Sequence, residues 1–273
     1  MNPTTSNFKA EALTNDVLRL QAPSIFAERP MNGLSSRYTF VPTTEIVAGL
    51  REKTWVPVDD EQQRARSALR FGFQKHLIRF RRAEQMQTLD EWNAELVLTN
   101  SHDAGCAYIL QVGIFRRLCS NGLVVSDQEF EAIRFRHAHL KTEEVVAASF
   151  RILEYVPKIG ALIERFRNRQ LSDSEALTFA RNALLLRYDS QEQSPVDART
   201  LLTLRRAEDQ GSDLWTTFNR VQENLVRGGL SDGRRNRLGR LRTLRALSGI
   251  DSRIGLNKGL WSLAEQTAAN ALN

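Results

Sequence analysis

Hydrophobic and polar positions follow two different periods along the chain. From about residue 37 to residue 140, short apolar runs rich in β-branched and aromatic residues are separated by turn-forming residues, a pattern typical of strands. Thr43 and Thr44 offer N-caps for one short helix within this region, EIVAGLRE. The predicted strands are RYTFV, TWVPV, HLIRF, AELVLT, CAYILQVGIF and AIRFRH.

The last of these runs indicates what kind of sheet the strands form. Ile133 and Phe135 alternate with Arg134 and Arg136, so one face of the sheet is apolar and the other is basic. Such alternation is typical of an antiparallel sheet with one face in water. We therefore predict an antiparallel sheet with one core face.

The second half of the chain has helical periodicity. Thr142 precedes two glutamates and begins one predicted helix, and Pro157 suits the first turn of the next. Ser172 and Glu175 have the spacing of a capping box. A further helix begins at Ser212 and is closed by two glycines after residue 227. Its apolar stripe consists of Leu214, Phe218, Val221 and Leu225.

These patterns predict an α+β fold. An N-terminal antiparallel sheet with one or two short helices is followed by a mostly helical C-terminal half, which ends in an amphipathic segment over about 256–271. We assign residues 1–35 to an N-terminal arm, 36–140 to the β-rich region and 141–273 to the α-helical region, packed on the sheet as one globular unit. Residues 228–239 are predicted to form a mobile basic loop.

Composition places the chain among ordinary globular proteins. Of its residues 41% are hydrophobic and 26% are charged, which is ordinary for a globular protein. A chain of 273 residues is long enough to bury a core without disulfides. No apolar run has the length of a membrane span, and the N-terminal segment lacks the basic start and apolar centre of a signal peptide. Cys106 and Cys119 form no paired motif, which favours reduced, buried thiols. We expect a cytoplasmic protein that has no cofactor and does not bind membranes.

The charge of +6 is concentrated in two arginine-rich segments. Residues 64–82 contain no carboxylate, and residues 227–245 contain only Asp232. Arginine forks bind phosphate oxygens in bidentate fashion, so these segments favour a polyanionic partner over a merely solvated surface. The first holds Arg64, Arg66, Arg70, Lys75, Arg79, Arg81 and Arg82; the second holds Arg227, Arg234, Arg235, Arg237, Arg240, Arg242 and Arg245.

The stretch NSHDAG, between two predicted strands, combines side chains that occur in catalytic and metal sites. As a hairpin turn it needs no chemistry, and neighbouring residues of an extended chain point in opposite directions, which disfavours a serine triad. His137 and His139 are two apart on a predicted strand and share a face, so His102 and Asp103 complete a candidate metal site. The default interpretation is a satisfied histidine with no metal bound.

A second polar cluster follows the strand that ends at Phe115. The dipeptide NG predicts a turn, so Arg116, Arg117 and Asn121 are expected at one end of the sheet beside NSHDAG. A phosphate-binding groove would combine this rim with Arg79, Arg81, Arg134 and Arg136. Aromatic residues interleaved with the basic ones suit base stacking, although core packing is the commoner role: Phe71, Phe73 and Phe80.

Several of these blocks together resemble one known family. RYTFVPTTEIVAGLREKTWVPV, KHLIRF, LTNSHDAGCAYILQVGIFRRLCSNGLVV, FRHAH, DLWTTFNRVQENLVRGG and NKGLWSLAE are similar to the phage- and plasmid-borne family known as domain of unknown function 932. The resemblance runs from about residue 36 to residue 268. It implies a protein of a plasmid, prophage or integrated element and assigns no activity to named residues. Ala104 departs from the pattern, because a glycine is expected directly after Asp103.

Three classes of function remain open. The leading hypothesis is a nucleic-acid-binding protein, favouring single-stranded DNA, that serves annealing, recombination or protection and assembles into a homo-oligomer such as a ring or filament. The order of helix, strands and helices is similar in outline to single-strand annealing recombinases, an analogy of fold only. One alternative is a metal-assisted nuclease or hydrolase using His102, Asp103, His137 and His139. The other is a protein-interaction module that blocks a host defence. The sequence favours binding over catalysis.

Overall fold

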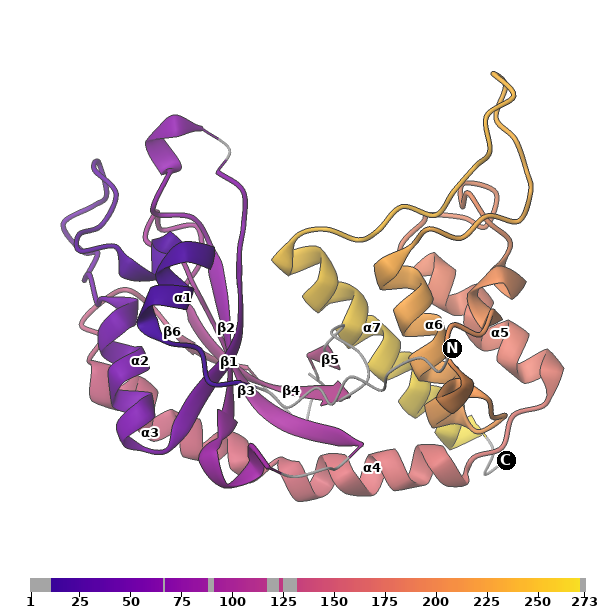
Figure 1. Ribbon diagram of the computed structural model, residues 1–273, viewed down its shortest axis with the longest axis horizontal. Helices are drawn as coiled ribbons and strands as arrows, with labels where there is room; N and C mark the ends of the chain where they lie inside the picture. The colour runs from indigo at the N-terminus through magenta and orange to yellow at the C-terminus, as the bar shows by residue number, and fades with distance from the viewer. Residues whose placement is uncertain (1–10, 66, 88–90, 117–122, 125–131, 271–273) are drawn as a thin grey trace, which may run out of the picture. The chain divides into compact units, whose positions relative to one another are not determined.

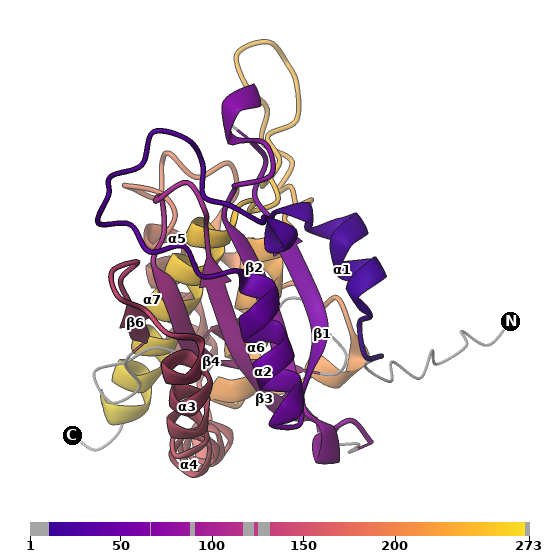
Figure 2. The ribbon, with the colours of Figure 1, turned by 90° about the vertical axis from the view of Figure 1, so that its left-hand side faces the viewer.

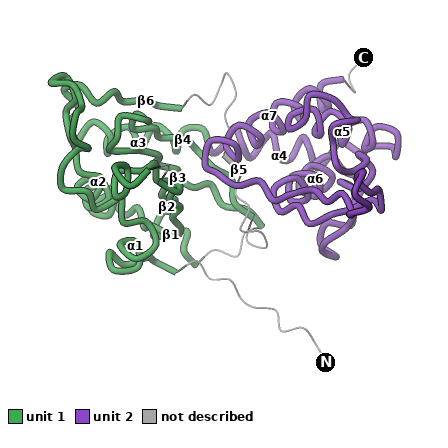
Figure 3. Tube along the Cα trace, turned by 90° about the horizontal axis from the view of Figure 1, so that it is seen from above, with its two compact units in different colours: residues 1–155 green, residues 156–273 purple. Residues whose placement is uncertain are grey.

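The computed structural model describes residues 11–65, 67–87, 91–116, 123–124 and 132–270 (Figure 1). The chain forms two compact units, residues 1–155 and residues 156–273 (Figure 3). The first unit contains the sheet and the second is helical, so the predicted α+β class is confirmed. The helix that follows the sheet, α3 (Thr142–Leu153), belongs to the first unit, although the sequence grouped it with the later helices.

One antiparallel sheet organises the first unit. Within the described residues its path is β1-β2-β3-β4, and both β5 and β6 pair with β4. With the exception of β5, the strands coincide with predicted apolar runs, whose residues alternate in burial or are buried on both faces. Their bounds are β1 (Trp55–Gln62), β2 (His76–Arg82), β3 (Trp92–Asn100), β4 (Tyr108–Arg116), β5 (Leu123–Val124) and β6 (Ile133–Phe135).

Two helices cover one face of this sheet. α2 (Thr43–Glu52) and α3 lie side by side in front of the strands (Figure 2). Trp55 Nε1 donates to Ser149 Oγ of α3 at 3.0 Å, which ties the helix to the first strand. The fully buried side chains beneath the helices form the core of the unit: Ile46, Leu50, Ile78, Phe80, Leu96, Leu98 and Leu110.

The N-terminal region contains structure that its sequence did not announce. α1 (Asn15–Gln21) begins at Thr14, whose hydroxyl accepts a hydrogen bond from Val17 N, and the helix buries Leu18. Leu13 N donates to Pro57 O at 2.8 Å, so this segment lies against β1. The sequence placed these residues in an arm. Short 3-10 helices complete the unit: η1 (Pro23–Phe26), η2 (Ala68–Arg70) and η3 (Ala83–Gln85).

Two predictions about the first unit are wrong. RYTFV is not a strand; Thr39 N donates to His137 O at 2.8 Å, and the rings of Tyr38 and Phe40 contact imidazoles instead of joining the sheet. The N-cap of α2 is Pro42 rather than a threonine, because the hydroxyl of Thr43 is used elsewhere.

The second unit is a small helical domain. Its core contains the aromatic rings of Phe166, Phe179, Phe218 and Trp261, which pack with centroid separations between 5.2 and 6.5 Å. Its helices are α4 (Val156–Asn168), α5 (Asp173–Leu185), α6 (Leu214–Arg227) and α7 (Ile250–Ala269), with the 3-10 helices η4 (Ala198–Leu202) and η5 (Ala207–Asp209).

Most of the predicted helix signals of this unit are confirmed. Ser172 and Glu175 form a complete capping box at the start of α5, and the apolar stripe predicted for α6 is buried. Asp213 rather than Ser212 caps α6, and α7 begins before the predicted amphipathic segment. No helix in the described part of the chain is long and apolar enough to cross a membrane.

Candidate nucleic-acid interface and the polar cluster beside it

A buried polar cluster occupies one end of the sheet, around the hydroxyl of Thr43. His76 begins β2, Asn100 ends β3 and Tyr108 begins β4. Because these neighbouring strands are antiparallel, the three residues lie at the same end of the sheet. Thr43 Oγ1 lies 3.0 Å from both His76 Nε2 and His102 Nε2, 3.1 Å from Tyr108 Oη and 3.2 Å from Asn100 Nδ2. All five side chains are buried.

The valence of one hydroxyl decides which of these contacts are hydrogen bonds. Thr43 has one proton and two lone pairs, so at most three neighbours bond to it at once. Tyr108 donates to Val41 O at 2.7 Å, and the Nδ1 of His76 faces Ser24 Oγ at 3.0 Å and Gln74 O at 3.3 Å. We infer that His76 is protonated on Nδ1 and accepts from Thr43. Asn100 and His102 then donate to Thr43, which satisfies it fully.

The cluster also fastens the chain segments that precede α2. Met31 N donates to His102 O at 2.9 Å, and His102 N donates to Phe73 O at 3.0 Å. Ser24 reaches the cluster through His76. The backbone of the S-H-D block therefore joins the N-terminal segment to the loop between β1 and β2.

Burial keeps both imidazoles of the cluster neutral. Desolvation lowers the pKa of His76 to about 4 and that of His102 to about 3, and the proximity of the two rings adds to the second shift. The pKa of Tyr108 is raised by burial, and burial together with the Asp103 carboxylate raises the pKa of Tyr38 to about 12. Neutral, hydrogen-bonded groups of this kind hold the fold together.

The residues proposed for a metal site point to different partners. Asp103 accepts from Arg70 at 2.8 Å and from Gly105 N at 2.9 Å. His137 stacks on Tyr38 with ring centroids 4.5 Å apart, and its Nε2 lies 3.0 Å from Cys106 O. His139 is exposed, with φ of 57°.

The prediction that His137 and His139 share a strand face is wrong, because β6 ends at Phe135. In the described ranges no three histidine, cysteine or carboxylate side chains stand close enough to hold a metal ion. Ala104, at the position where a glycine is expected, has a left-handed φ of 60°. A glycine adopts that conformation without strain, which accounts for the expectation.

Several arginines of the first basic segment are neutralised within the sheet. Arg79 contacts Glu95 at 2.7 Å and Asp59 at 2.6 Å, and its guanidinium carbon lies 3.4 Å from the centre of the Phe115 ring. Arg81 contacts the same Glu95 at 2.6 Å. These arginines lie on the sheet face opposite α2 and α3, because they alternate with Phe80. Both arginines are therefore paired with carboxylates of the sheet.

The other residues predicted to bind nucleic acid on or near the sheet are exposed, paired with a carboxylate, or outside the described residues. Arg134 and Arg136 are exposed, and the pairing Ile109↔Arg134 places Arg134 on the same face as Arg79. Arg82 contacts Glu84 at 2.9 Å, and Arg116 lies 3.6 Å from Glu91. Three candidates lie outside the described residues: Arg66, Arg117 and Asn121.

The loop between β1 and β2, described at residues 63–65 and 67–75, carries exposed basic side chains, and we call it the basic loop. Arg64 and Arg70 are exposed, and Phe71 is 67% exposed in spite of its ring. Lys75 adjoins β2 at the end of the loop. An exposed phenylalanine between arginines offers both phosphate contacts and a flat face on which a base can stack.

The second basic segment forms a hairpin-like arm, residues 230–244, which extends away from the helices of its own unit (Figure 1). Leu244 N donates to Leu230 O, Arg242 N to Arg234 O and Asn236 N to Arg240 O, each at 2.8 Å. Where the sequence predicts a mobile loop, the structure therefore has a ladder of backbone hydrogen bonds. Its exposed basic residues are Arg234, Arg235, Arg237 and Arg240.

Known proteins are similar in sequence to this chain over almost its whole length. The model of the family described as domain of unknown function (DUF932) matches residues 30–261. The chain belongs to the DUF932 family. Two relatives in Escherichia coli (strain K12), the UPF0380 proteins YfjQ and YafZ, are each 34% identical over 253 residues, which is 93% of this chain and 90% of each relative. No solved structure matches the chain.

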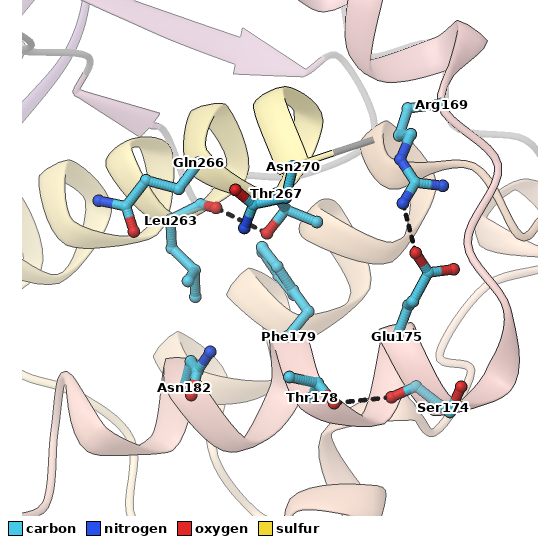
Figure 4. Close-up of a pocket in the computed structure, with 10 residues that line it drawn as sticks. All are labelled: Arg169, Ser174, Glu175, Thr178, Phe179, Asn182, Leu263, Gln266, Thr267 and Asn270. Carbon is cyan, nitrogen blue, oxygen red and sulfur yellow. Dashed lines mark hydrogen bonds and ion pairs between the residues drawn. The ribbon is translucent and has the colours of Figure 1, made fainter. Parts of the chain in front are cut away.

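This DUF932 protein also contains a groove that its sequence did not indicate. It has a volume of about 310 Å³ and lies between α5 and α7 (Figure 4). Arg169 and Glu175 pair at one end, while Thr178 Oγ1 donates to Ser174 O at 2.8 Å along the wall. Its amide-bearing side chains come from two helices far apart in the sequence, which no local pattern links: Asn182, Gln266 and Asn270.

Proposed function

We propose that this protein binds nucleic acid, with a preference for single strands, and serves DNA annealing, recombination or protection in a phage, plasmid or other mobile element. The observation that carries the proposal is that the two arginine-rich segments hold exposed guanidinium groups for which the described residues supply no carboxylate. They belong to Arg64 in the basic loop and to Arg235, Arg237 and Arg240 in the arm.

The chemistry of these groups supports a polyphosphate ligand. An exposed guanidinium without a counter-ion gains by binding a phosphate, and the release of condensed counter-ions from the nucleic acid drives the association. Arg79 and Arg81 differ from these groups, because their salt bridges with Glu95 leave them little free energy to gain from a phosphate. Phe71 adds a stacking surface that favours unpaired bases over a duplex.

Titrations of the full-length protein with a short single-stranded oligonucleotide and with its duplex test the proposal. For a single strand, the logarithm of the association constant falls linearly with the logarithm of the salt concentration. Replacement of Arg235, Arg237 and Arg240 by glutamine is expected to make this slope shallower by about 0.7 for each phosphate that loses its arginine. The matched control replaces three exposed arginines on α3, α4 and α5: Arg151, Arg165 and Arg181. No salt-sensitive affinity for either oligonucleotide, or equal effects of the two triple variants, would contradict the proposal.

The preference for single strands depends on Phe71. Phe71→Ala is expected to weaken single-strand binding by about 1–3 kcal/mol, the contribution of one stacked base, and to leave duplex binding almost unchanged. Leu69→Ala is the control, because Leu69 is 82% exposed in the same loop but offers no ring. Fluorescence anisotropy with both oligonucleotides measures the difference. Equal losses of affinity for single strand and duplex would remove the stacking argument.

The alternatives are less well supported. A hydrolase needs reacting groups that are open to substrate, whereas His102 is fully buried and bonded to Thr43. Asp103 is engaged by Arg70. That the protein is an interaction module which blocks a host defence stays a prediction. It is supported if a pull-down from nuclease-treated host lysate retains a protein partner.

A further inference from the structure

The arm exposes apolar side chains that nucleic-acid binding leaves unexplained. Leu238 at its tip is 79% exposed, and Leu241 is 52% exposed. Phosphates would satisfy the neighbouring arginines but would offer these leucines no apolar surface. Single exposed leucines are common on proteins. Two of them lie on one projecting segment among arginines, and a protein surface with an apolar floor and negative charge around it would complement both kinds of side chain.

The arm is organised before it meets a partner. Besides its internal ladder, Arg242 donates to Ser194 O at 2.6 Å and Arg187 donates to Arg245 O at 2.6 Å, which fixes the base of the arm to its own unit. Gly229 N donates to Leu244 O at 2.7 Å. A preformed projection loses little conformational entropy when it docks, so even a small contact can contribute to association.

The first unit contains a groove with complementary chemistry. It lies on the outer side of α2 and α3 and has a volume of about 580 Å³. Its floor is made by small residues, because α2 and α3 approach so closely that a Cβ on Gly49 would stand 2.9 Å from Val146 Cγ2. Phe150, 41% exposed, forms an apolar wall. The rim carries three glutamates and one lysine: Glu45, Glu52, Glu143 and Lys53.

We propose that the arm of one copy of this chain docks in the α2–α3 groove of a second copy. Leu238 and Leu241 would cover the apolar floor, while Arg237 and Arg240 would face the glutamates of the rim. Two copies of a chain with a net charge of +6 repel each other overall, whereas the glutamates of this groove attract a basic segment of the second copy. Arm and groove are different surfaces, so the contact is heterologous and builds rings or filaments.

Self-association of the nuclease-treated, full-length protein tests this proposal in the absence of nucleic acid. Sedimentation velocity over a concentration series at low salt is expected to show a mass that rises with concentration. Leu238→Ser with Leu241→Ser is expected to weaken association roughly tenfold or more, because two leucines would no longer be buried. Circular dichroism checks that the variant keeps its helical content, since the two leucines lie outside the core.

Charge reversal identifies the groove as the site of docking. Arg237→Glu with Arg240→Glu, and separately Glu52→Lys with Glu143→Lys, are each expected to weaken self-association roughly tenfold. An equimolar mixture of the two variants is expected to regain it, because the acidic arm of one then meets the basic groove of the other. A merely unfolded or aggregated variant would not be rescued by mixing.

The control has the same change of charge outside the two helices that form the groove. Glu28→Lys with Glu208→Lys reverses two exposed glutamates that belong to neither α2 nor α3 and do not line the groove, and it is expected to associate like the unchanged protein. A chain that stays monomeric throughout the series overturns the proposal. It is equally overturned if the groove variant associates normally while the arm variant does not, or if mixing fails to restore association. All of these measurements are made without nucleic acid, so their outcome is distinguishable from that of the oligonucleotide titrations.

Discussion

At the scale of single residues, Thr43 is held by four polar neighbours around one buried hydroxyl. Its hydroxyl bonds side chains from two strands and from the S-H-D block, none of which reaches bulk water. The sequence suggested a helix cap for this threonine and a turn or a metal ligand for His102. The structure instead makes both parts of one buried network, so the most conspicuous polar motif of the chain is used to hold segments together.

Replacement of Thr43 by valine measures the strength of this network. Thr43→Val keeps the shape of the side chain but leaves Asn100 and two histidines without their shared partner. We expect the free energy of unfolding to fall by about 2–4 kcal/mol, the cost of one missing hydrogen bond plus unsatisfied buried groups. Thr44→Val, one residue further along α2 and partly exposed, is the control. Urea denaturation that gave equal stabilities for both variants would show that the network contributes little.

At the scale of elements, the end of α6 decides how the arm leaves the helical unit. Gly228 has φ of 61° and ψ of −146°, a conformation almost restricted to glycine. A Cβ there would stand 2.4 Å from the backbone carbon of Arg245, on the returning side of the arm. The two glycines predicted to end the helix therefore also hold the base of the arm closed.

The two glycines are expected to differ sharply on substitution. Gly228→Ala combines backbone strain with a clash against main-chain atoms, and we expect it to destabilise the protein by about 2–4 kcal/mol. Gly229→Ala meets no atom within 4 Å, so its positive φ alone should cost about 1–2 kcal/mol. Thermal unfolding of the two variants provides the comparison. A Gly228 variant as stable as the Gly229 variant would show that the arm shifts easily.

At the scale of the whole molecule, the buried histidines couple folding to pH. The folded-state pKa values of His76 and His102, about 4 and 3, lie below the value near 6.5 of an exposed imidazole. The unfolded chain therefore binds protons at a pH where the folded chain does not. Their contribution to stability is complete above about pH 6.5 and is lost as the pH falls toward 4.

Urea denaturation across that range checks the sign and the size of this coupling. We expect the free energy of unfolding to decrease by up to about 1.4 kcal/mol per pH unit for each buried histidine between roughly pH 6 and pH 4. His102→Gln is expected to reduce the slope by up to about 1.4 kcal/mol per pH unit, the contribution of one proton, and His139→Gln, which removes an exposed imidazole, is the control. A slope that is the same in all three proteins would exclude the cluster as its source.

The elements were predictable where one local signal dominates. The capping box at Ser172 and the apolar stripe of α6 were found because helix ends and amphipathic faces are determined by residues within a few positions of each other. RYTFV failed because its side chains contact imidazoles that lie far along the chain. The candidate site divides in the same way: the sequence located the basic segments, but gave no sign that Glu95 neutralises Arg79 and Arg81.

The sequence alone determined the α+β order, most of the strand and helix segments and the concentration of arginine in two stretches, since periodicity and composition are local properties. Only the tertiary structure decided which arginines lack a carboxylate partner. A salt bridge between strands depends on their register, and β2 and β3 place Glu95 beside Arg79 and Arg81. In the arm Arg234 pairs with Asp232, whereas Arg235, Arg237 and Arg240 meet no carboxylate among the described residues. It also decided that the S-H-D histidine is buried, since burial follows from the convergence of segments that lie far apart in the chain.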